Sequence, residues 1–418
     1  MPRIGFYGDD FTGSVDALLQ LREAGLGGVL VTSPDVEPPP GDLQVVGIAG
    51  TSRSLPTPAM AAEAGPALSR LRELGAEVVQ YKACSTADSS PDVGSLGRAV
   101  ELGREVFPAA VPVPVAFAQP GFGRYTFFGH HFARDGAQVH RLDRQPTMRR
   151  HPVTPATESD LRLHLSAQTD LPIGSLHWPA LADPAEVAKV LNGAGDAAVV
   201  CDAFTDEHLD VIAAALMAGA SRPRFVLGAG GLSGALGRAL EVDDRLRPLR
   251  TEATASSVPT LVLSGSRSAL TQRQLTAAER AGWSTVDPFG AEAIRRIRRH
   301  LARGTSVTVD STLGEAPRAS SAIEERLAEI AAACLRQEPT TRLVLCGGDT
   351  SGNVLRRLGI QRLSIENRPW GNVAVCVAVG AARHLRAVEV VLKGGQMGHE
   401  DLLDDVRHGR PLTPHSPI

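Results

Sequence analysis

The stretch IGFYGDDFTGS, residues 4–14, decides the fold class that we predict for this chain. It begins with an apolar run, Ile4–Gly8, that predicts a buried strand, and it turns at once into two aspartates and several helix-capping residues. Units of this kind, a short β-branched run followed by an Ala-, Leu- and Arg-rich segment, recur almost throughout the sequence. The alternation predicts an α/β fold built on mostly parallel sheets flanked by helices.

The expected strands lie in both halves of the chain. They are residues 4–8, 44–49, 78–82, 113–118, 197–202 and 225–228, followed by 260–264, 306–310, 343–346, 373–379 and 388–393. Because 418 residues exceed the size of one ordinary core, we expect two domains. A shift from charged to small residues places a linker at 246–258, between an N-terminal domain at 1–245 and a C-terminal domain at 259–418.

Composition narrows the class of protein. The chain is 43% hydrophobic and 21% charged, which is typical of a globular protein in water and not of a disordered one. We find no long apolar run and no signal-peptide layout, so we expect a cytoplasmic protein without a membrane partner. A net charge of −3 gives no reason to expect nucleic acid, and the five scattered cysteines are expected to be mostly buried thiols. The chain could form a homodimer.

Ligands of open α/β sheets bind beyond the carboxyl ends of the strands, so the residues after each strand are the candidates for a site. Asp9 and Asp10 follow the first expected strand. One of them could simply cap the helix expected near Ser14. Because adjacent carboxylates repel each other, we favour the alternative that one of them contacts substrate hydroxyls or a cation.

Three cationic residues, Arg53, Lys82 and Arg124, each follow a strand of the same expected sheet. Any one of them alone would be interpreted as a solvated surface charge. Their equivalent positions predict that they converge on one anion, either a carboxylate or a phosphate. The adjacent histidines His130 and His131 are expected at the surface.

Glycine turns in the second half indicate phosphate binding. Gly347, Gly348 and Thr350 lie between a buried strand and a helix, a geometry in which backbone N–H groups and the helix dipole bind phosphate. Similar turns occur at Lys393–Gly395 and at Ser264–Ser266. The chain has neither a Walker A string nor a dinucleotide-binding fingerprint after its first strand.

Read in order, these motifs resemble those of the four-carbon acid sugar kinase family over nearly the whole chain. The motifs are GDDFTGS at 8–14, YK at 81–82 with Ser85 and Thr86, GR at 123–124, HPVTP at 151–155, GAGGL at 228–232, SGS at 264–266, GGDT at 347–350 and KGG at 393–395. The resemblance implies a sugar-acid-binding N-terminal domain and a nucleotide-binding C-terminal domain that close on each other around an active-site cleft. It also implies ATP with Mg²⁺ as the phosphoryl donor.

The resemblance carries roles over to particular residues. The residues expected at the ATP site are Ser264, Ser266, Gly347, Gly348, Asp349, Thr350, Lys393, Gly394 and Gly395. Those expected to face the sugar acid are Asp9, Asp10, Arg53, Lys82 and Arg124. For the catalytic carboxylate, the position of Asp349 at the phosphate turn makes it the first candidate, and Asp10 is the second. The metal ligands are left open.

Three substrate-domain positions depart from the family pattern. Cys84 stands where an aspartate is usual, Asp88 where an arginine is usual, and Gly50 where an aspartate is common. These departures bear on the identity of the acid and leave the phosphoryl donor unaffected. The opening GDDFTGS is similar to that of kinases acting on 3-oxo-isoapionate, our first substrate, ahead of erythronate, threonate and 3-oxo-tetronate.

Two other classes of function stay open from the sequence. An NAD(P)-dependent sugar-acid dehydrogenase would also use glycine turns and acid substrates, although the dinucleotide fingerprint is missing. A non-enzymatic sugar-acid sensor would need no phosphate-binding domain and would usually bring a DNA-binding segment, which we do not find.

Overall fold

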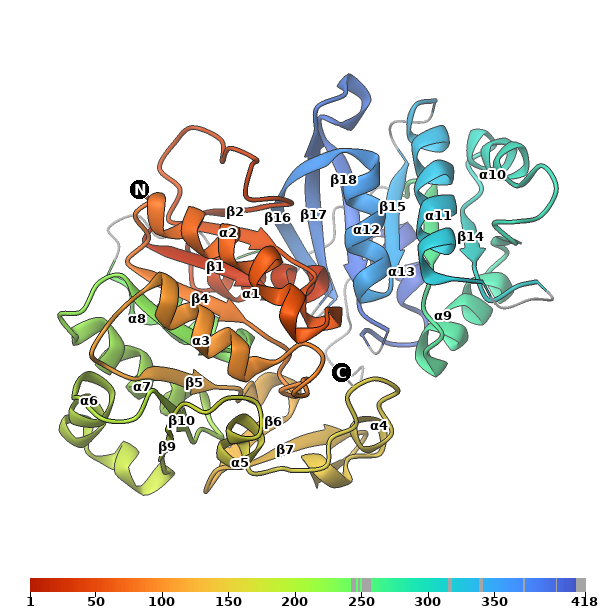
Figure 1. Ribbon diagram of the computed structural model, residues 1–418. Coiled ribbons are helices and arrows are strands. Elements are labelled where there is room, and N and C mark those ends of the chain that lie inside the picture. Colours follow the sequence, from red (N-terminus) through yellow and green to blue (C-terminus); the bar gives the residue numbers. More distant parts are fainter. Residues whose placement is uncertain are drawn as a thin grey trace. The chain divides into compact units, whose positions relative to one another are not determined.

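A computed structural model describes residues 1–241, 246, 249, 257–314, 318–337, 341–370, 373–395 and 397–410, without the side chain of Asp349. The chain forms two compact units, one of Met1–Val29 with Ser33–Pro248 and one of Leu30–Thr32 with Leu249–Ile418. Most of the linker expected at 246–258 lies outside the described residues. Each unit is built on a largely parallel sheet with flanking helices, so the predicted fold class is confirmed (Figure 1).

The sheet of the first unit is entirely parallel, in the order β3-β1-β4-β11-β5-β10-β9. Its strands are β1 (Ile4–Gly8), β3 (Val45–Ala49), β4 (Val78–Lys82), β5 (Val113–Ala116), β9 (Ile173–Leu176), β10 (Ala198–Cys201) and β11 (Arg224–Gly228). Its helices are α1 (Phe11–Glu23), α2 (Met60–Glu73), α3 (Leu96–Val106), α4 (Pro146–Arg149), α5 (Leu161–Ser166), α6 (Pro184–Asn192), α7 (Asp206–Ala218) and α8 (Gly230–Ala239). Every strand expected in this half is present, and β9 was missed because its four residues carry little β-branched character.

Two glycines of β1 show which helix covers which face of the sheet. Gly5 lies against Leu71 of α2, whereas Gly8 lies against Ser14 of α1. Positions three apart on a strand face opposite sides, so α1 and α2 cover opposite faces. A Cβ atom at Gly8 would lie 2.0 Å from Ser14 Oγ, and this close approach of helix and strand requires glycine.

The strands of the first unit end together. The residues paired across their carboxyl ends are, in order along the sheet, Ala49, Gly8, Lys82, Gly228 and Ala116. The loops that carry the candidate residues therefore all leave from one edge. Beyond that edge lies a small antiparallel sheet of β6 (Arg124–Phe127), β7 (His130–Asp135) and β8 (Gln138–Arg141). We missed this sheet because its strands alternate polar and apolar residues only over short runs.

The second unit has the strand order β13-β14-β12-β15-β18-β17-β16. Its strands are β12 (Thr260–Ser264), β13 (Ser284–Val286), β14 (Val307–Asp310), β15 (Arg342–Cys346), β16 (Ile360–Trp370), β17 (Val373–Gly380) and β18 (Val388–Lys393). Its helices are α9 (Ala269–Arg280), α10 (Ala293–Ala302), α11 (Ser320–Leu335), α12 (Gly348–Leu358) and α13 (Leu402–His408). The first five strands in that order are parallel to one another, whereas β16 and β17 form an antiparallel extension.

A segment from the first half of the sequence completes this second sheet. Leu30 and Val31, from β2 (Gly28–Val31), pair antiparallel with β16, and the hydroxyl of Thr32 donates to the carbonyl of Ile360 over 2.9 Å. We predicted no strand at 28–31, and four apolar or small residues in a row gave no indication of a sheet that they would join. Among the described helices, none is long and apolar enough to cross a bilayer.

Candidate functional site

The two aspartates that follow β1 are bound by one arginine. Arg53 donates from Nε and Nη2 to the carboxylate of Asp9, over 3.1 and 2.6 Å, and from Nη1 and Nη2 to that of Asp10, over 2.8 and 2.9 Å. Asp10 is also the N-cap of α1, because its Oδ1 accepts the N–H of Gly13 over 2.7 Å. Asp10 therefore caps α1 and also pairs with Arg53, and its contact with substrate hydroxyls stays a prediction.

Burial and charge shape the electrostatics of this cluster. Burial raises the pKa of the Asp9 carboxyl above its usual value, the Arg53 charge opposes that shift, and the neighbouring Asp10 reinforces it. Burial by itself would lower the pKa of Arg53, but the Asp10 and Asp9 carboxylates hold it well above its usual value. Arg53 therefore stays charged and offsets part of the negative charge of the two aspartates.

Lys82 ends β4 beside this cluster and is almost completely buried. A Cβ atom at Gly13 would lie 2.3 Å from Asp10 Oδ1, 3.2 Å from Lys82 Nζ and 3.5 Å from Arg53 Nη2, so the three charged groups surround one glycine. Lys82 Nζ also lies 3.6 Å from Oδ2 of Asp16, on α1. Lys82 and Arg53 thus lie close together, each next to a carboxylate of the protein, and the convergence of the three cations on one bound anion stays a prediction.

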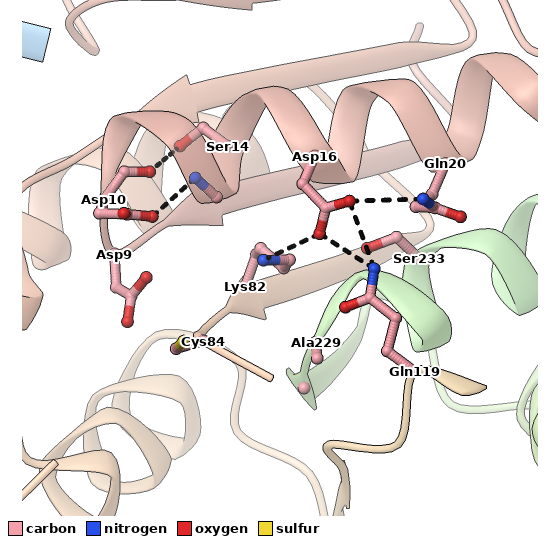
Figure 2. A network of polar contacts seen from close by, with 12 residues as sticks. Asp9, Asp10, Ser14, Asp16, Gln20, Lys82, Cys84, Gln119, Ala229 and Ser233 are labelled. Carbon is pink, nitrogen blue, oxygen red and sulfur yellow. Dashed lines mark hydrogen bonds and ion pairs between the residues drawn. The ribbon is translucent and has the colours of Figure 1, made fainter. Parts of the chain in front are cut away.

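Asp16 and Gln119 join the network and were not among our candidates (Figure 2). Gln119 Nε2 donates to both oxygens of Asp16, over 3.3 and 3.2 Å, and Gln20 Nε2 donates to Oδ1 over 3.3 Å. A signal for Asp16 was present in the sequence, because it is the one charged residue between Phe11 and Leu21 on a largely apolar helix.

Arg124 lies in the loop region of the same unit but is engaged differently. Its Nη1 donates to the carbonyls of Phe122 and Gly123, over 2.9 and 3.3 Å, while its Nε is buried with no hydrogen-bond partner among the described residues. Burial lowers the pKa of its guanidinium. Cys84 lies within electrostatic reach of both Arg124 and Arg53.

The other departures from the family pattern have local partners. Asp88 accepts a hydrogen bond from the hydroxyl of Thr154 and lies 3.8 Å from Nδ1 of His151, both from the HPVTP motif. At Gly50 a Cβ atom would lie 2.0 Å from the hydroxyl oxygen of Tyr7. An aspartate cannot occupy position 50 here, because the Tyr7 ring fills its space.

His131 contradicts its expected surface position. It is fully buried, its Nε2 donates to the carbonyl of Ser85 over 2.7 Å, and its Nδ1 accepts from the hydroxyl of Thr126 over 3.0 Å. Burial lowers its pKa to about 4, so the ring is neutral. His131 thereby fixes the loop after Lys82 to the small sheet. The contact could not be predicted, because the short strands of that sheet were not recognised in the sequence.

In the second unit the candidate loops also leave from one sheet edge. The residues paired across the strand ends are, in order, Asp310, Ser264, Cys346 and Lys393. Because paired residues of neighbouring parallel strands point to the same face, these four side chains form one row. The loops with Ser266, with Gly347 and Gly348, and with Gly394 and Gly395 begin directly after it.

The three loops pack closely against one another. A Cβ atom at Gly265 would lie 2.4 Å from Thr350 Oγ1, and one at Gly395 would lie 3.0 Å from Ser266 Oγ. Gly347 has φ +115°, in the region that favours glycine, and as the N-cap of α12 it supplies no side-chain hydrogen bond to the helix. The first amides of α12 therefore face an edge built from glycine and hydroxyl groups.

Lys393 is fully buried and donates from Nζ to Thr271 Oγ1 over 2.9 Å; burial lowers its pKa. Thr271 Oγ1 in turn donates to the carbonyl of Gly395 over 3.2 Å, so the lysine supports the glycine loop from beneath. Asp349 lies in the first turn of α12, and its side chain is outside the described part of the chain.

Oxygen groups suited to a hard cation occur at this edge. Ser264 Oγ is buried without a hydrogen-bond partner among the described residues, and Asp310 is paired with Ser264 across the strand ends. The Asp310 carboxylate accepts hydrogen bonds from the N–H and the hydroxyl of Thr312. Within the described ranges no three His, Cys, Asp or Glu side chains cluster as metal ligands. Mg²⁺ commonly uses one or two carboxylates together with substrate phosphates, so this donor set fits Mg²⁺ bound with a nucleotide.

Family comparisons agree with this division of the chain. Residues 4–236 match the model of a sugar-binding N-terminal domain, and residues 261–403 match that of a nucleotide-binding C-terminal domain. The chain is 34% identical to 3-oxo-isoapionate kinase of Paraburkholderia graminis, over 97% of this chain and 94% of that one. It is 33% identical to 3-oxo-tetronate kinase of Pseudomonas fluorescens, over 96% and 95%.

Solved structures share the fold over the same length. A protein of Salmonella typhimurium described as a putative tRNA synthase superposes with a TM-score of 0.80 at 27% identity, covering 98% of this chain and 99% of that one. A Haemophilus influenzae protein superposes with a TM-score of 0.75 at 23% identity, over 98% and 100%. The chain therefore belongs to the family that joins a sugar-binding N-terminal domain to a nucleotide-binding C-terminal domain, the four-carbon acid sugar kinases.

Proposed function

We propose that this protein is a sugar-acid kinase that transfers the γ-phosphate of ATP to a hydroxyl group of 3-oxo-isoapionate or a close relative of that acid. One observation carries the proposal: the unit that matches a sugar-binding domain has a charged strand-end cluster, and the unit that matches a nucleotide-binding domain has an edge of glycine turns. The 34% identity to 3-oxo-isoapionate kinase supports the choice of acid, ahead of 3-oxo-tetronate, erythronate and threonate.

The first unit would bind the acid through side chains. Lys82 supplies a buried cation for the carboxylate, and Asp9 and Asp10, held by Arg53, supply acceptors for hydroxyl groups. Arg124 is a further proposed contact with the acid. The second unit would bind ATP through the amides that follow Gly265 and Gly347 and through Ser264, Ser266, Thr350, Gly394 and Gly395, with Lys393 beneath.

Mg²⁺ would be held by Asp310, with Ser264 and Thr350 as neutral oxygen groups. When bound it neutralises phosphate charge, which is the main requirement of phosphoryl transfer. A carboxylate that accepts or orients the proton of the attacking hydroxyl completes the machinery. Asp349 is the proposed group, and Asp10 is the second candidate.

An ADP-release assay tests the function with 3-oxo-isoapionate, 3-oxo-tetronate, erythronate and threonate as acceptors. We expect turnover with at least one acid and a rise in melting temperature with ATP and Mg²⁺ but not with NAD(P). Stabilisation by NAD(P) without ADP release would favour a dehydrogenase, and stabilisation by acids alone would favour a sensor. Asp349→Asn should lower kcat by about 10²- to 10⁴-fold with the fold intact. If kcat does not fall in Asp349→Asn but falls in Asp10→Asn, Asp10 is the base.

A further inference from the structure

The side-chain amide of Gln119 lies at the first unit's strand-end edge and is only 4% exposed. Its backbone is held in place, because its N–H donates to the carbonyl of Arg124 over 3.0 Å and its own carbonyl accepts the N–H of Arg124 over 3.2 Å. A short backbone bridge therefore fixes the point from which the side chain of Gln119 projects.

Asp16 decides which way the amide of Gln119 is turned. Carboxylate oxygens only accept hydrogen bonds, so the NH₂ group must face Asp16, to whose oxygens it donates over 3.3 and 3.2 Å. The carbonyl oxygen Oε1 is consequently turned away from Asp16, as Figure 2 shows. That oxygen is buried and has no hydrogen-bond partner among the described residues. In native proteins the large majority of buried polar atoms have such a partner.

The neighbours of this oxygen indicate what would bind it. An amide oxygen accepts from a hydroxyl group and repels a carboxylate, so it cannot be the site of the acid group itself. Lys82 Nζ lies 3.6 Å from Asp16 Oδ2, one of the two oxygens to which the Gln119 NH₂ group donates, so the ammonium and the amide share one carboxylate. A sugar acid with its carboxylate at Lys82 carries its nearest hydroxyl on the next carbon, and that hydroxyl is the group that we pair with Gln119.

Gly230, the first residue of α8, leaves room for this pair of side chains. A Cβ atom there would lie 2.4 Å from Asp16 Oδ2 and 2.7 Å from Gln119 Nε2. Any larger residue would displace the amide, so the glycine gives an independent way to disturb it.

We propose that Gln119 is a specificity-determining residue whose Oε1 accepts a hydrogen bond from the 2-hydroxyl of the sugar acid, next to the carboxylate at Lys82. The inference rests on the proposed function and narrows its substrate class to 2-hydroxy acids. Asp16 acts as a positioning residue, because it turns the amide and pairs with the lysine.

Calorimetric binding without ATP tests the assignment with erythronate, with 3,4-dihydroxybutanoate, which lacks the 2-hydroxyl, and with 2,4-dihydroxybutanoate, which lacks the 3-hydroxyl. The wild type should bind erythronate about 5- to 30-fold more tightly than the 2-deoxy acid. In Gln119→Met, which keeps the length of the side chain but removes the acceptor, this ratio should fall to near one. The ratio between erythronate and the 3-deoxy acid should not change.

Gln20→Met is the matched control, because Gln20 also donates to the Asp16 carboxylate, at Oδ1, and its loss should leave both ratios as they are. Gly230→Ala should reproduce the effect of Gln119→Met. An unchanged 2-deoxy ratio in Gln119→Met, in a wild type that releases ADP with sugar acids, overturns the inference and leaves the kinase assignment standing. So does an active kinase that binds neither erythronate nor threonate. A wild type that phosphorylates no sugar acid overturns the proposed function instead.

Discussion

The edges at which the strands of the two sheets end differ in the chemical groups that they present. In the first unit charged side chains gather at the strand ends, where Arg53 binds Asp9 and Asp10, and Lys82 faces Asp16. In the second unit the loops carry glycine and hydroxyl groups above a buried lysine. A site made of side chains can change its ligand by substitution, whereas a site made of backbone has room for few side chains. The departures from the family pattern at Cys84, Asp88 and Gly50 all fall in the first unit.

The largest effect expected from this contrast concerns Gly347. Gly347→Val should abolish measurable ATP binding while sugar-acid binding survives, because a side chain would enter the space that the phosphate needs and φ +115° disfavours any other residue. Calorimetry with ATP and with the acid measures both affinities. Gly304→Val is the matched control, since Gly304 also has positive φ, at +75°, but no atom lies near its Cβ position. If ATP still binds to Gly347→Val, the nucleotide turn is misplaced.

Arg53→Met should destabilise the first unit by about 3–5 kcal/mol, because it leaves two buried carboxylates side by side without their cation. Burial and repulsion hold the pKa of Asp9 high, so protonation should reduce the loss as the pH falls. Denaturant unfolding at pH 7 and at pH 5 measures the effect.

The control is Arg98→Met, which removes an arginine that pairs with Glu101 and Glu105 on the surface of α3 and should cost less than about 1 kcal/mol. Equal losses for the two variants would show that the Asp9 and Asp10 cluster is no more dependent on its cation than a surface pair.

His131 should make the stability of the first unit sensitive to acid. An unfolded histidine takes up a proton below pH 6.5, whereas the folded ring stays neutral until about pH 4. Stability is therefore fully present above pH 6.5 and is lost as the pH falls to 4, by about 3 kcal/mol in total. His131→Gln removes the titrating group. The difference between the unfolding free energies of the wild type and the variant should therefore become smaller as the pH falls from 6.5 to 4. A parallel pair of pH profiles would contradict the burial of His131.

The smallest expected effect distinguishes the role of Lys82 in binding the acid from that of Arg124. Lys82→Met should weaken binding of the sugar acid by about tenfold to 150-fold and binding of its neutral amide much less. The reason is that a charge-assisted hydrogen bond contributes about 1.5–3 kcal/mol. In Arg124→Met we expect a smaller ratio between the loss for the acid and the loss for the amide, since Arg124 Nη1 already donates to loop carbonyls. The values of kcat/KM for acid and amide give both ratios. Equal losses on both compounds in Lys82→Met would assign the lysine to loop support.

The sequence by itself determined the α/β class and most strands, because strand and helix patterns are local and repeat along the chain. It also determined the candidate loops, since parallel strands bring their carboxyl ends to one edge whatever their order. Thus Asp9, Lys82, Ser264 and Gly347 lie at the sheet edges where the motifs indicated.

Only the tertiary structure decided which of these residues contact one another. Nothing local shows that Arg53 binds both aspartates, that Asp16 turns the amide of Gln119, or that His131 is buried against Ser85, because each contact joins segments far apart in the sequence. The same holds for Leu30–Thr32, which lie early in the chain yet belong to the second unit. Side-chain pairing and sheet membership depend on three-dimensional proximity, which a pattern along the chain does not encode.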